Sequence, residues 1–584
     1  MCGIVACVGK ENASEFVISG LKRLEYRGYD SFGYALNDNG KLVLEKKTGK
    51  ISSYKFSPKK SGIAIGHTRW ATHGKVSITN AHPHLSNNGE IAVVHNGIIE
   101  NFFELRNFLK SKGIKFYSET DTEVIPNLIQ HYMKQKNSFQ EASRLASKQI
   151  EGFYAFMAMH IKSNSIVLSR YGSPLVIGIG KNTVFAASDA NAFIHKTRNA
   201  VYLEDGELAV LDGGYKVLKT ATGKIVSPTV TTINWSLEQA RKGKHKHFME
   251  KEIFEQPETI KAAAAQQPEL LENAASILGK ASKIILIGCG TSFHACIAGA
   301  SMLSKATGKV CIPRLASEID GLLGIIDAGT AVISVSQSGE TADVIEAVKK
   351  IQEKKAKLIS LTNVRGSSLS RLSDLDLPMN CGPEICVLST KSYTSQLALL
   401  LLIASQIGGK QKNAKGLLEK TAQSAKKVIE KNSKLAERLA IEMSRKGHMF
   451  LIGKGMQHTT AMEGALKIKE VSYIHAEGFP GAELKHGTIA LIEKGVPVIV
   501  CSDDSTRSQI INNALEIKLR GGTIIGIDSK NSPAFDHWFE VPEIGEAQPM
   551  LSILPIQLFA YHLAVERDLD PDMPRNLAKS VTVK

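Results

Sequence analysis

A cysteine directly behind the initiator methionine raises the first chemical question, because it precedes a glycine and a short apolar run, MCGIVACVG. Cys2 can be a small hydrophobic residue that starts a strand. If Met1 is removed, Cys2 instead carries a thiol and a free α-amino group on one residue. Such an amine, with a pKa of about 7.7–8.0, can accept a proton beside its own thiol at neutral pH. Cys2 alone leaves both interpretations open.

Three polar clusters follow in the first half of the chain: GHTRWATHGK (66–75), HNGIIEN (95–101) and SETDTE (118–123). The first two lie at the ends of apolar runs, and we expect the third to follow a short strand. A primary amide substrate needs a nucleophile, a proton acceptor and donors for the oxyanion. The side chain of Asn96 and the close-approaching backbone of a glycine, Gly97, can supply those donors.

Two charged residues in these clusters can bind the α-carboxylate and the α-ammonium group of an amino-acid amide. Arg69 can hold a carboxylate through two parallel hydrogen bonds, and Asp121 can hold an α-ammonium group. With Cys2 as the nucleophile, these residues predict a pocket for glutamine.

The second half contains a different kind of candidate site. SQSGET (336–341) follows the apolar run AVISV and opens a helix, where hydroxyls, backbone N–H groups and the helix dipole converge on an anion. The same letters also suit an ordinary serine-rich helix N-cap. Two Gly-x-Gly turns begin other helices, but Phe293 stands where a dinucleotide fingerprint needs its third glycine, so we expect no nucleotide there.

The elements that must position these residues change character near residue 240. Before it, short β-prone runs with helices near 13–25 and 101–112 predict an α+β domain with antiparallel sheets. After 283, strands and helices alternate, which predicts parallel sheets with crossover helices. This half repeats itself, since KIILIGCGTSFHACIAGA (283–300) resembles HMFLIGKGMQHTTAMEGA (448–465).

We therefore expect an α+β domain followed by two tandem α/β domains. The expected boundaries are 1–240 for the α+β domain, 241–279 for a helical linker, 280–415 and 445–570 for the α/β domains, 416–444 for a helical connector and 571–584 for a tail.

Composition narrows the class of protein. The chain has 584 residues, 43% hydrophobic and 22% charged, which is ordinary for a globular protein. Its longest apolar run, 397–404, is far shorter than the ~20 residues of a membrane helix. The N-terminal residues do not have the pattern of a signal peptide, so we expect a cytoplasmic protein. Eight scattered cysteines predict neither a disulfide framework nor a structural metal.

The formal net charge of +15 fits a solvated surface and a phosphorylated substrate. The basic cluster RKGKHKH (241–247) lacks the interleaved aromatic residues of a single-strand binder, so nucleic-acid binding is not favoured.

The order and spacing of a dozen motifs resemble one enzyme family along essentially the whole chain. MCGIV, LEYRGYDS, HTRWATHG, HNGIIEN and SETDTE resemble the N-terminal-nucleophile (Ntn) glutaminase domain of class II amidotransferases. HFMEKEIFEQP, CGTS, SQSGET, STKSYTSQ, LKIKEVSYIHAE, ELKHG and PRNLAKSVTV resemble the sugar-isomerase (SIS) half of the isomerising glutamine–fructose-6-phosphate aminotransferases. The resemblance favours the nucleophile interpretation of Cys2.

The resemblance implies roles for residues of the first half. Cys2 is then the nucleophile, and Asn96 with Gly97 forms the oxyanion hole. The residues that it implies for gripping glutamine are Arg69, Thr72, His73 and Asp121. Trp70 matches a residue that gates an ammonia channel, although a core aromatic is also expected there, and Arg27 lies in a loop that closes over the site.

In the second half the resemblance implies a sugar-phosphate site. The phosphate loop is Ser336, Gln337, Ser338 and Thr341, and further sugar contacts come from Thr291, Ser292, Val387 and Ser389. Glu470 is the isomerisation base, and Lys467, three residues earlier on the same helix face, assists proton movement; from the residues alone this pair could be a surface ion pair. His486, supplied by a neighbouring subunit, opens the sugar ring, and Lys579 forms a Schiff base with the open-chain sugar.

The implied reaction converts L-glutamine and D-fructose 6-phosphate to L-glutamate and D-glucosamine 6-phosphate, the first step of hexosamine synthesis, in a homodimer without metal, nucleotide or redox cofactor. His82-Pro83-His84 could suggest a metal, but we expect none.

Two alternative functions compete with this one. A phosphoribosyl-type class II amidotransferase is disfavoured by SQSGET and by the α/β repeat. A sugar-phosphate sensor would lack residues such as Cys2. Phe32, Cys386 and Thr488 depart from the family pattern without removing a catalytic group.

Overall fold

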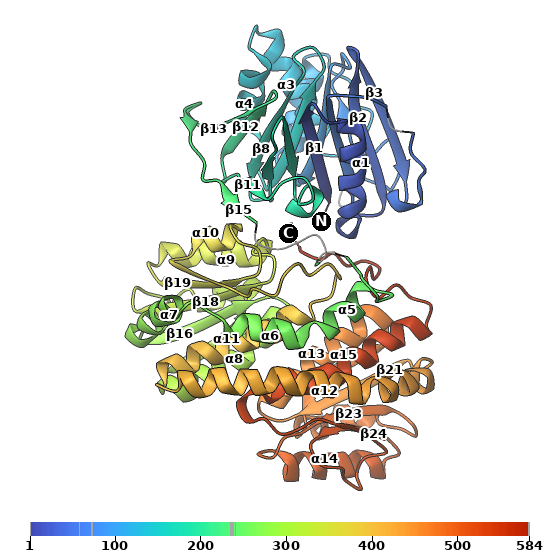
Figure 1. Ribbon diagram of the computed structural model, residues 1–584, viewed down its shortest axis with the longest axis vertical. Coiled ribbons are helices and arrows are strands. Elements are labelled where there is room, and N and C mark those ends of the chain that lie inside the picture. The colour runs from blue at the N-terminus through green and yellow to red at the C-terminus, as the bar shows by residue number, and fades with distance from the viewer. Residues whose placement is uncertain (1, 58, 72–73, 234–238, 240, 582–584) are drawn as a thin grey trace. The chain divides into compact units, whose positions relative to one another are not determined.

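The computed structural model of the chain describes residues 2–57, 59–71, 74–233, 239 and 241–581. These residues group into two units: Met1–Ala240 together with Ala578–Lys584, and Arg241–Leu577 (Figure 1). The division near residue 240 is where the composition of the sequence changes. Each unit has its own sheets and cores.

Two antiparallel sheets form the centre of the first unit. The eight-stranded sheet has the order β15 (Thr231–Thr232), β11 (Asn199–Tyr202), β9 (Val176–Ile179), β10 (Thr183–Ala187), β1 (Gly3–Gly9), β4 (Ile63–Arg69), β2 (Ser31–Asp38) and β3 (Lys41–Thr48). The seven-stranded sheet has the order β14 (Ile225–Val226), β13 (Tyr215–Lys219), β12 (Glu207–Leu211), β8 (Ser165–Tyr171), β7 (Tyr154–His160), β6 (Ile91–Gly97) and β5 (His84–Leu85).

Side-chain alternation along the strands produces a helix–sheet–sheet–helix stack. In β1, Ile4, Ala6 and Val8 point into the core between the two sheets, whereas Val5 and Cys7 pack on the other side with α1 (Ala13–Arg23). The outer face of the seven-stranded sheet is covered by α2 (Phe102–Ser111), α3 (Val124–Lys134) and α4 (Phe139–Gln149). This layering confirms the predicted α+β class with antiparallel sheets.

The second unit holds two five-stranded parallel sheets with the same strand order, one in each of two lobes. The first lobe has β17 (Val310–Leu315), β16 (Lys283–Gly288), β18 (Thr330–Ser336), β19 (Lys357–Thr362) and β20 (Leu375–Pro378). The second lobe has β22 (His475–Pro480), β21 (His448–Gly453), β23 (Pro497–Cys501), β24 (Thr523–Asp528) and β25 (His537–Glu540). The predicted internal repeat and the predicted parallel sheets are confirmed.

Helices cover both sheets and join the lobes. The helices are α5 (Phe248–Phe254), α6 (Gln256–Ala264), α7 (Pro268–Lys280), α8 (Thr291–Thr307), α9 (Ala342–Glu353), α10 (Ser368–Leu372), α11 (Lys391–Ile407), α12 (Gln411–Met443), α13 (Met456–Ser472), α14 (Arg507–Leu519) and α15 (Gln548–Glu566). One large core contains residues of both sheets and of most of these helices, including α12, which runs across the unit where the lobes meet (Figure 1). The longest apolar run is buried inside α11.

Two local details qualify the sequence predictions. SETDTE does not follow a strand, because residues 114–118 have no regular secondary structure. In the described part of the chain, no helix has both the length and the apolar character needed to cross a membrane.

Candidate active sites

Cys2 lies beside the loop that leaves β4. Because Gly3 of β1 pairs with Thr68 of β4, the residue before Gly3 reaches the backbone just after Arg69. There the Trp70 N–H donates to the Cys2 Sγ at 3.2 Å, and the Sγ lies 3.4 Å from the Trp70 carbonyl oxygen. Burial raises the pKa of the Cys2 thiol, against the lowering effect of the Trp70 hydrogen bond and the Arg69 charge. A thiol held protonated in this way needs a neighbouring base before it can attack.

Asn96 and Gly97 reach the same place from the other sheet. They end β6, and the Asn96 Nδ2 donates to the carbonyl oxygen of Cys2 at 2.9 Å. Gly97 has φ +125°, and a Cβ at this position would lie 2.0 Å from the Phe153 carbonyl oxygen. Only glycine fits this backbone conformation and this close approach. The two predicted oxyanion residues therefore lie next to the predicted nucleophile.

The charged residues predicted for glutamine are buried around these elements. Arg69 ends β4, and burial lowers its pKa, although the charges of Cys2, Asp121 and Asp30 act in the opposite direction. Asp121 accepts a hydrogen bond from the N–H of Ile99 at 2.8 Å, which ties the SETDTE segment to the residues that follow Gly97. Thr72 and His73 lie outside the described residues.

Two further predicted residues of the first unit have structural partners. The Trp70 ring makes an edge-on contact with Tyr29, with centroids 5.4 Å apart. Arg27, in a short 3-10 helix (Glu25–Arg27), forms an ion pair with Asp189 and donates to the Tyr26 hydroxyl at 3.3 Å. The channel-gating and loop-closing roles of these residues stay predictions.

A buried group of four histidines supports the SETDTE segment, and sequence reasoning missed it. His82 and His95 both contact the Thr122 hydroxyl, at 2.8 and 2.9 Å, and His84 contacts the Thr120 hydroxyl at 3.1 Å. The fourth member, His67, stacks on His82 with ring centroids 4.1 Å apart. Two threonines that flank Asp121 are thus held from one side.

Burial keeps three of these histidines, His67, His82 and His84, uncharged. Burial, then the Arg69 charge, lowers the pKa of His67 to about 3, and the pKa values of His82 and His84 are well below the usual range for similar reasons. His-Pro-His was the only sequence signal, and it suggested a metal. Among the described residues, no group of three or more histidine, cysteine or acidic side chains could hold a metal ion.

In the second unit, SQSGET forms a closed turn between β18 and α9. The Ser336 hydroxyl accepts the Gly339 N–H and contacts the Thr341 hydroxyl, both at 3.0 Å. Gly339 has φ +64°, and a Cβ there would lie 2.0 Å from the Ser367 Oγ, so the turn requires glycine. Ser338 accepts the N–H of Glu340 at 3.2 Å, and Gln337 contributes its carbonyl oxygen to the N–H of Asn363.

The turn ends at the N-terminus of a full helix. Thr341 directly precedes α9, and its hydroxyl does not cap the helix. The first-turn N–H groups and the hydroxyls therefore face the position where an anion binds to a helix N-terminus.

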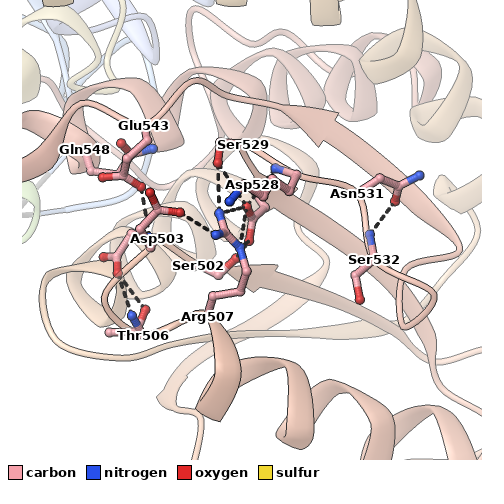
Figure 2. Close-up of polar contacts among 12 residues, drawn as sticks. Ser502, Asp503, Thr506, Arg507, Asp528, Ser529, Asn531, Ser532, Glu543 and Gln548 are labelled. Atoms are coloured by element: carbon pink, nitrogen blue, oxygen red, sulfur yellow. Dashed lines mark hydrogen bonds and ion pairs between the residues drawn. The ribbon is translucent and has the colours of Figure 1, made fainter.

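The equivalent loop of the second lobe is arranged differently. It runs from Ser502 to Thr506, between β23 and α14, and the adjacent Arg507 guanidinium pairs with Asp528 (Figure 2). Asp503 accepts hydrogen bonds from the backbone N–H of Thr506 at 2.9 Å and from its hydroxyl at 2.8 Å. Burial raises the pKa of Asp528, but the hydrogen bonds from Arg507 and Ser502 outweigh it and lower the value. In this loop an acidic side chain therefore accepts hydrogen bonds from donors that a phosphate would otherwise use.

Thr291, Lys467 and Glu470 meet where the two lobes join. Thr291 begins α8 after the Gly-x-Gly turn, and its hydroxyl accepts a hydrogen bond from the Lys467 Nζ at 3.1 Å. The same Nζ lies 2.7 Å from the Glu470 Oε2. Lys467 is fully buried, which by itself lowers its pKa, but Glu463 and Glu470 outweigh burial and raise it. The pair is therefore not the surface ion pair that the residues alone also allowed.

The remaining sugar-site candidates lie on positioned loops. Ser292 accepts a hydrogen bond from the Gln396 amide at 3.1 Å, and the Val387 N–H donates to the Asp572 carbonyl oxygen at 3.1 Å. Ser389 is half-buried in the same loop as Val387. The loop is anchored by the buried Glu252, which accepts the N–H of Ile385 at 2.6 Å and that of Cys386 at 3.2 Å.

Two predicted residues stand apart from these contacts. His486 is exposed in a 3-10 helix (Glu483–His486), and within the described part of the chain no hydrogen bond or ion pair joins it to another predicted sugar-site residue. Lys579 is half-buried and belongs to the segment that groups with the first unit.

Comparison with known proteins finds a different domain family in each of the two units. The family model of the glutamine amidotransferase domain matches residues 67–195, and that of the SIS domain matches residues 277–406 and 442–567. The glutamine–fructose-6-phosphate aminotransferases (isomerizing) of Pyrococcus horikoshii and Clostridium perfringens are 41% and 40% identical to this chain, each over 100% of both chains.

Solved structures resemble the second unit. The C-terminal domain of glucosamine-fructose-6-phosphate aminotransferase from Francisella tularensis has a TM-score of 0.52 and 32% identity, and the match covers 57% of this chain and 99% of that one. Tagatose-6-phosphate ketose/aldose isomerase from Escherichia coli, at 19% identity and a TM-score of 0.51, covers 56% of this chain and 95% of its own length and shares the fold.

Proposed function

The chain belongs to the family of isomerising glutamine–fructose-6-phosphate aminotransferases, and we propose that it converts L-glutamine and D-fructose 6-phosphate to L-glutamate and D-glucosamine 6-phosphate. The protein is an enzyme of hexosamine synthesis. Its first unit releases ammonia from glutamine, and its second unit adds that ammonia to the sugar.

Cys2 is the nucleophile of the first unit. After removal of Met1, the Cys2 thiol attacks the amide carbon of glutamine and its proton passes to the free α-amine of the same residue. That amine then protonates the leaving nitrogen, and ammonia leaves from the tetrahedral intermediate. Water then hydrolyses the thioester to glutamate. The contact of Asn96 with the Cys2 carbonyl, and the tie between Asp121 and Ile99, support oxyanion and α-ammonium sites at this place.

The α-carboxylate of glutamine pairs with Arg69. We assign Thr72 and His73 to the same pocket and Arg27 and Trp70 to its rim, as the family resemblance implies.

The second unit binds the sugar phosphate at its first-lobe loop. Ser336, Ser338 and Thr341, with the N-terminus of α9, hold the phosphate, and Gln337 belongs to the same loop. Thr291, Ser292, Val387 and Ser389 contact the sugar. In the second lobe the Ser502 hydroxyl donates to Asp528 and the Thr506 donors bond to Asp503, so the equivalent loop has these donors already occupied.

Isomerisation follows amination at C2. Lys579 first forms an imine with the C2 ketone and releases water; ammonia then displaces the lysine. Glu470 removes a proton from C1 and returns it to C2, and Lys467 moves the proton of the sugar hydroxyl. The 2.7 Å contact between the Lys467 and Glu470 side chains supports this pairing of roles.

We further propose that the enzyme works as a cytoplasmic homodimer. The exposed position of His486 supports this arrangement, because a neighbouring subunit can then supply the ring-opening histidine. Equilibrium sedimentation of the full chain tests it, and a monomer that is active at low concentration would exclude a site shared between subunits.

The observation that carries the proposal is the presence of both site clusters in one chain: Cys2 with Asn96, and Lys467 with Glu470. Incubation with amide-¹⁵N glutamine and fructose 6-phosphate, followed by mass spectrometry, tests it. We expect labelled glucosamine 6-phosphate and one equivalent of glutamate. Glutamate with free ammonia alone would exclude the transfer. Glu470→Gln should retain glutamine hydrolysis and lose the aminated sugar.

A further inference from the structure

We propose that His294 and Glu463 are positioning residues that hold the Lys467 ammonium against Glu470 at the sugar site. This inference rests on the proposed function, because it concerns the site where the sugar would be isomerised. Each residue lies in one copy of the internal repeat, 283–300 and 448–465, but the sequence analysis assigned neither a role. Their side chains meet where the two lobes join.

Glu463 lies at the centre of the contacts. It is on α13, four residues before Lys467 and seven before Glu470, a spacing that places the three side chains along one face of the helix. Its side chain is fully buried. One carboxylate oxygen, Oε1, accepts the Thr291 hydroxyl at 3.0 Å and lies 3.3 Å from the Lys467 Nζ.

His294 satisfies the other oxygen. Its Nδ1 lies 2.7 Å from the Glu463 Oε2, so an N–H at Nδ1 donates to the carboxylate. His294 and Thr291 are three residues apart in the first turn of α8, in the first lobe, whereas Glu463 belongs to the second lobe. Through Glu463, two donors of one lobe therefore fix the cation of the other.

The distances show how Lys467 is shared between its two carboxylates. Its Nζ is 2.7 Å from Glu470 but 3.3 Å from Glu463. A fully buried carboxylate with an empty acceptor site is costly and would draw the nearest cation toward itself. Because His294 and Thr291 donate to Glu463, Lys467 stays closer to Glu470.

The neighbouring titratable groups are consistent with a crowded polar junction. His458, on α13, has its pKa lowered by burial and by the charge of His294, and burial with the Glu463 charge raises the pKa of the Tyr393 hydroxyl. Among the described residues, these two groups adjoin the cluster that Glu463, Lys467 and Glu470 form on α13. The phosphate loop takes no part in the contacts described for the cluster of His294, Glu463 and Lys467. The affinity of that loop for the sugar phosphate should therefore not depend on His294.

Two substitutions of equal shape separate the hydrogen bond from the volume of the side chain. Asn offers an N–H close to the position of the histidine Nδ1, and Leu has the same shape without a donor. We expect His294→Leu to lower kcat for glucosamine 6-phosphate by about 10- to 100-fold, the effect of losing a hydrogen bond to a buried charge. His294→Asn should stay within about threefold of the wild type.

The readouts distinguish positioning from a loss of structure. The KM for fructose 6-phosphate and glutamine hydrolysis measured without sugar should be unchanged in both variants. With fructose 6-phosphate deuterated at C1, the kinetic isotope effect on kcat should be larger in His294→Leu than in the wild type, because proton transfer by Glu470 becomes slower. Wild-type kcat in His294→Leu, or equal losses in the two variants, would overturn the inference.

The melting transition of His294→Leu shows whether this variant folds. If it does not, a second variant still tests the inference. Glu463→Gln removes the carboxylate that shares Lys467, and we expect a fall in kcat with an unchanged KM; unchanged kcat would overturn the inference. A wild-type chain that hydrolyses glutamine but forms no aminated sugar would overturn the proposed function itself, and the inference with it.

Discussion

The side-chain amide of Asn96 donates a hydrogen bond to the backbone carbonyl of Cys2, 2.9 Å away. Asn96 ends β6 in one sheet of the first unit, and Cys2 precedes β1 in the other. The contact joins the two sheets at the point where both strands carry residues with the chemistry of amide hydrolysis. It places a polar donor beside the predicted nucleophile without any contribution from the second unit.

Asn96→Ala should lower kcat for glutamine hydrolysis by about 10²- to 10³-fold, the usual effect of removing one oxyanion donor. Glutamate release in the absence of sugar measures it. Asn101→Ala is the matched control, since Asn101 belongs to the same segment but donates to the Gln149 carbonyl oxygen. Activity of Asn96→Ala within twofold of the control would contradict an oxyanion role.

Gly97→Ala should destabilise the first unit by about 2–5 kcal/mol, because the new Cβ meets the Phe153 carbonyl oxygen and φ is +125°. Chemical denaturation of the full chain, followed by a probe in the first unit, measures the free energy of unfolding. Gly214→Ala is the control, since its φ is not positive and nothing lies within 4 Å of its Cβ position. Equal stability of the two variants would show that the backbone relaxes at residue 97.

Acid should destabilise the first unit through its buried histidines. The pKa of His67 is about 3 in the folded chain and about 6.5 when unfolded, so below about pH 6.5 the unfolded chain binds protons that the folded chain does not. Stability is therefore complete above that pH and falls as the pH decreases toward 3. His67 alone should cost about 2 kcal/mol at pH 5.

Pulsed hydrogen exchange after incubation at pH 8 and pH 5 checks this expectation in one sample. Peptides from β4 and β6 should lose protection at pH 5 in the wild type and lose less in His67→Gln, which can still donate to the His95 carbonyl oxygen. Peptides from β16 in the second unit are the internal control. Identical acid sensitivity of the wild type and His67→Gln would mean that other groups control it.

Much of this structure can be predicted from the sequence because many of its elements depend on patterns of residues that are close together in the chain. The alternation in β1, the Gly-x-Gly turn before α8 and the SQSGET turn before α9 are short-range patterns with direct physical meaning. The pairing of Glu463 with His294 has no such signal, since α8 and α13 are buried over much of their surface and neither helix shows which side meets the other lobe.

The histidines that hold Thr120 and Thr122 show the same limit. Three come from β4, β5 and β6, and the fourth lies two residues before β5, so the folded sheets bring them together. The expected strand before SETDTE was wrong because this segment is held by side-chain contacts and not by pairing in a sheet.

Thr341→Val and Thr506→Val form a matched pair for the two equivalent loops, because each threonine directly precedes the helix that follows its loop. The Thr341 hydroxyl contacts only the Ser336 hydroxyl among its described hydrogen bonds, whereas the Thr506 hydroxyl donates to the carboxylate of Asp503. Valine keeps the shape of threonine and removes the hydroxyl. Thr341→Val should raise the KM for fructose 6-phosphate by about tenfold, the effect of one lost hydrogen bond to a charged group. Thr506→Val should leave that KM unchanged and lower only the stability of the second lobe. Steady-state kinetics at saturating glutamine measure the difference, and an equal rise of KM in both variants would mean that the second-lobe loop also contributes to phosphate binding.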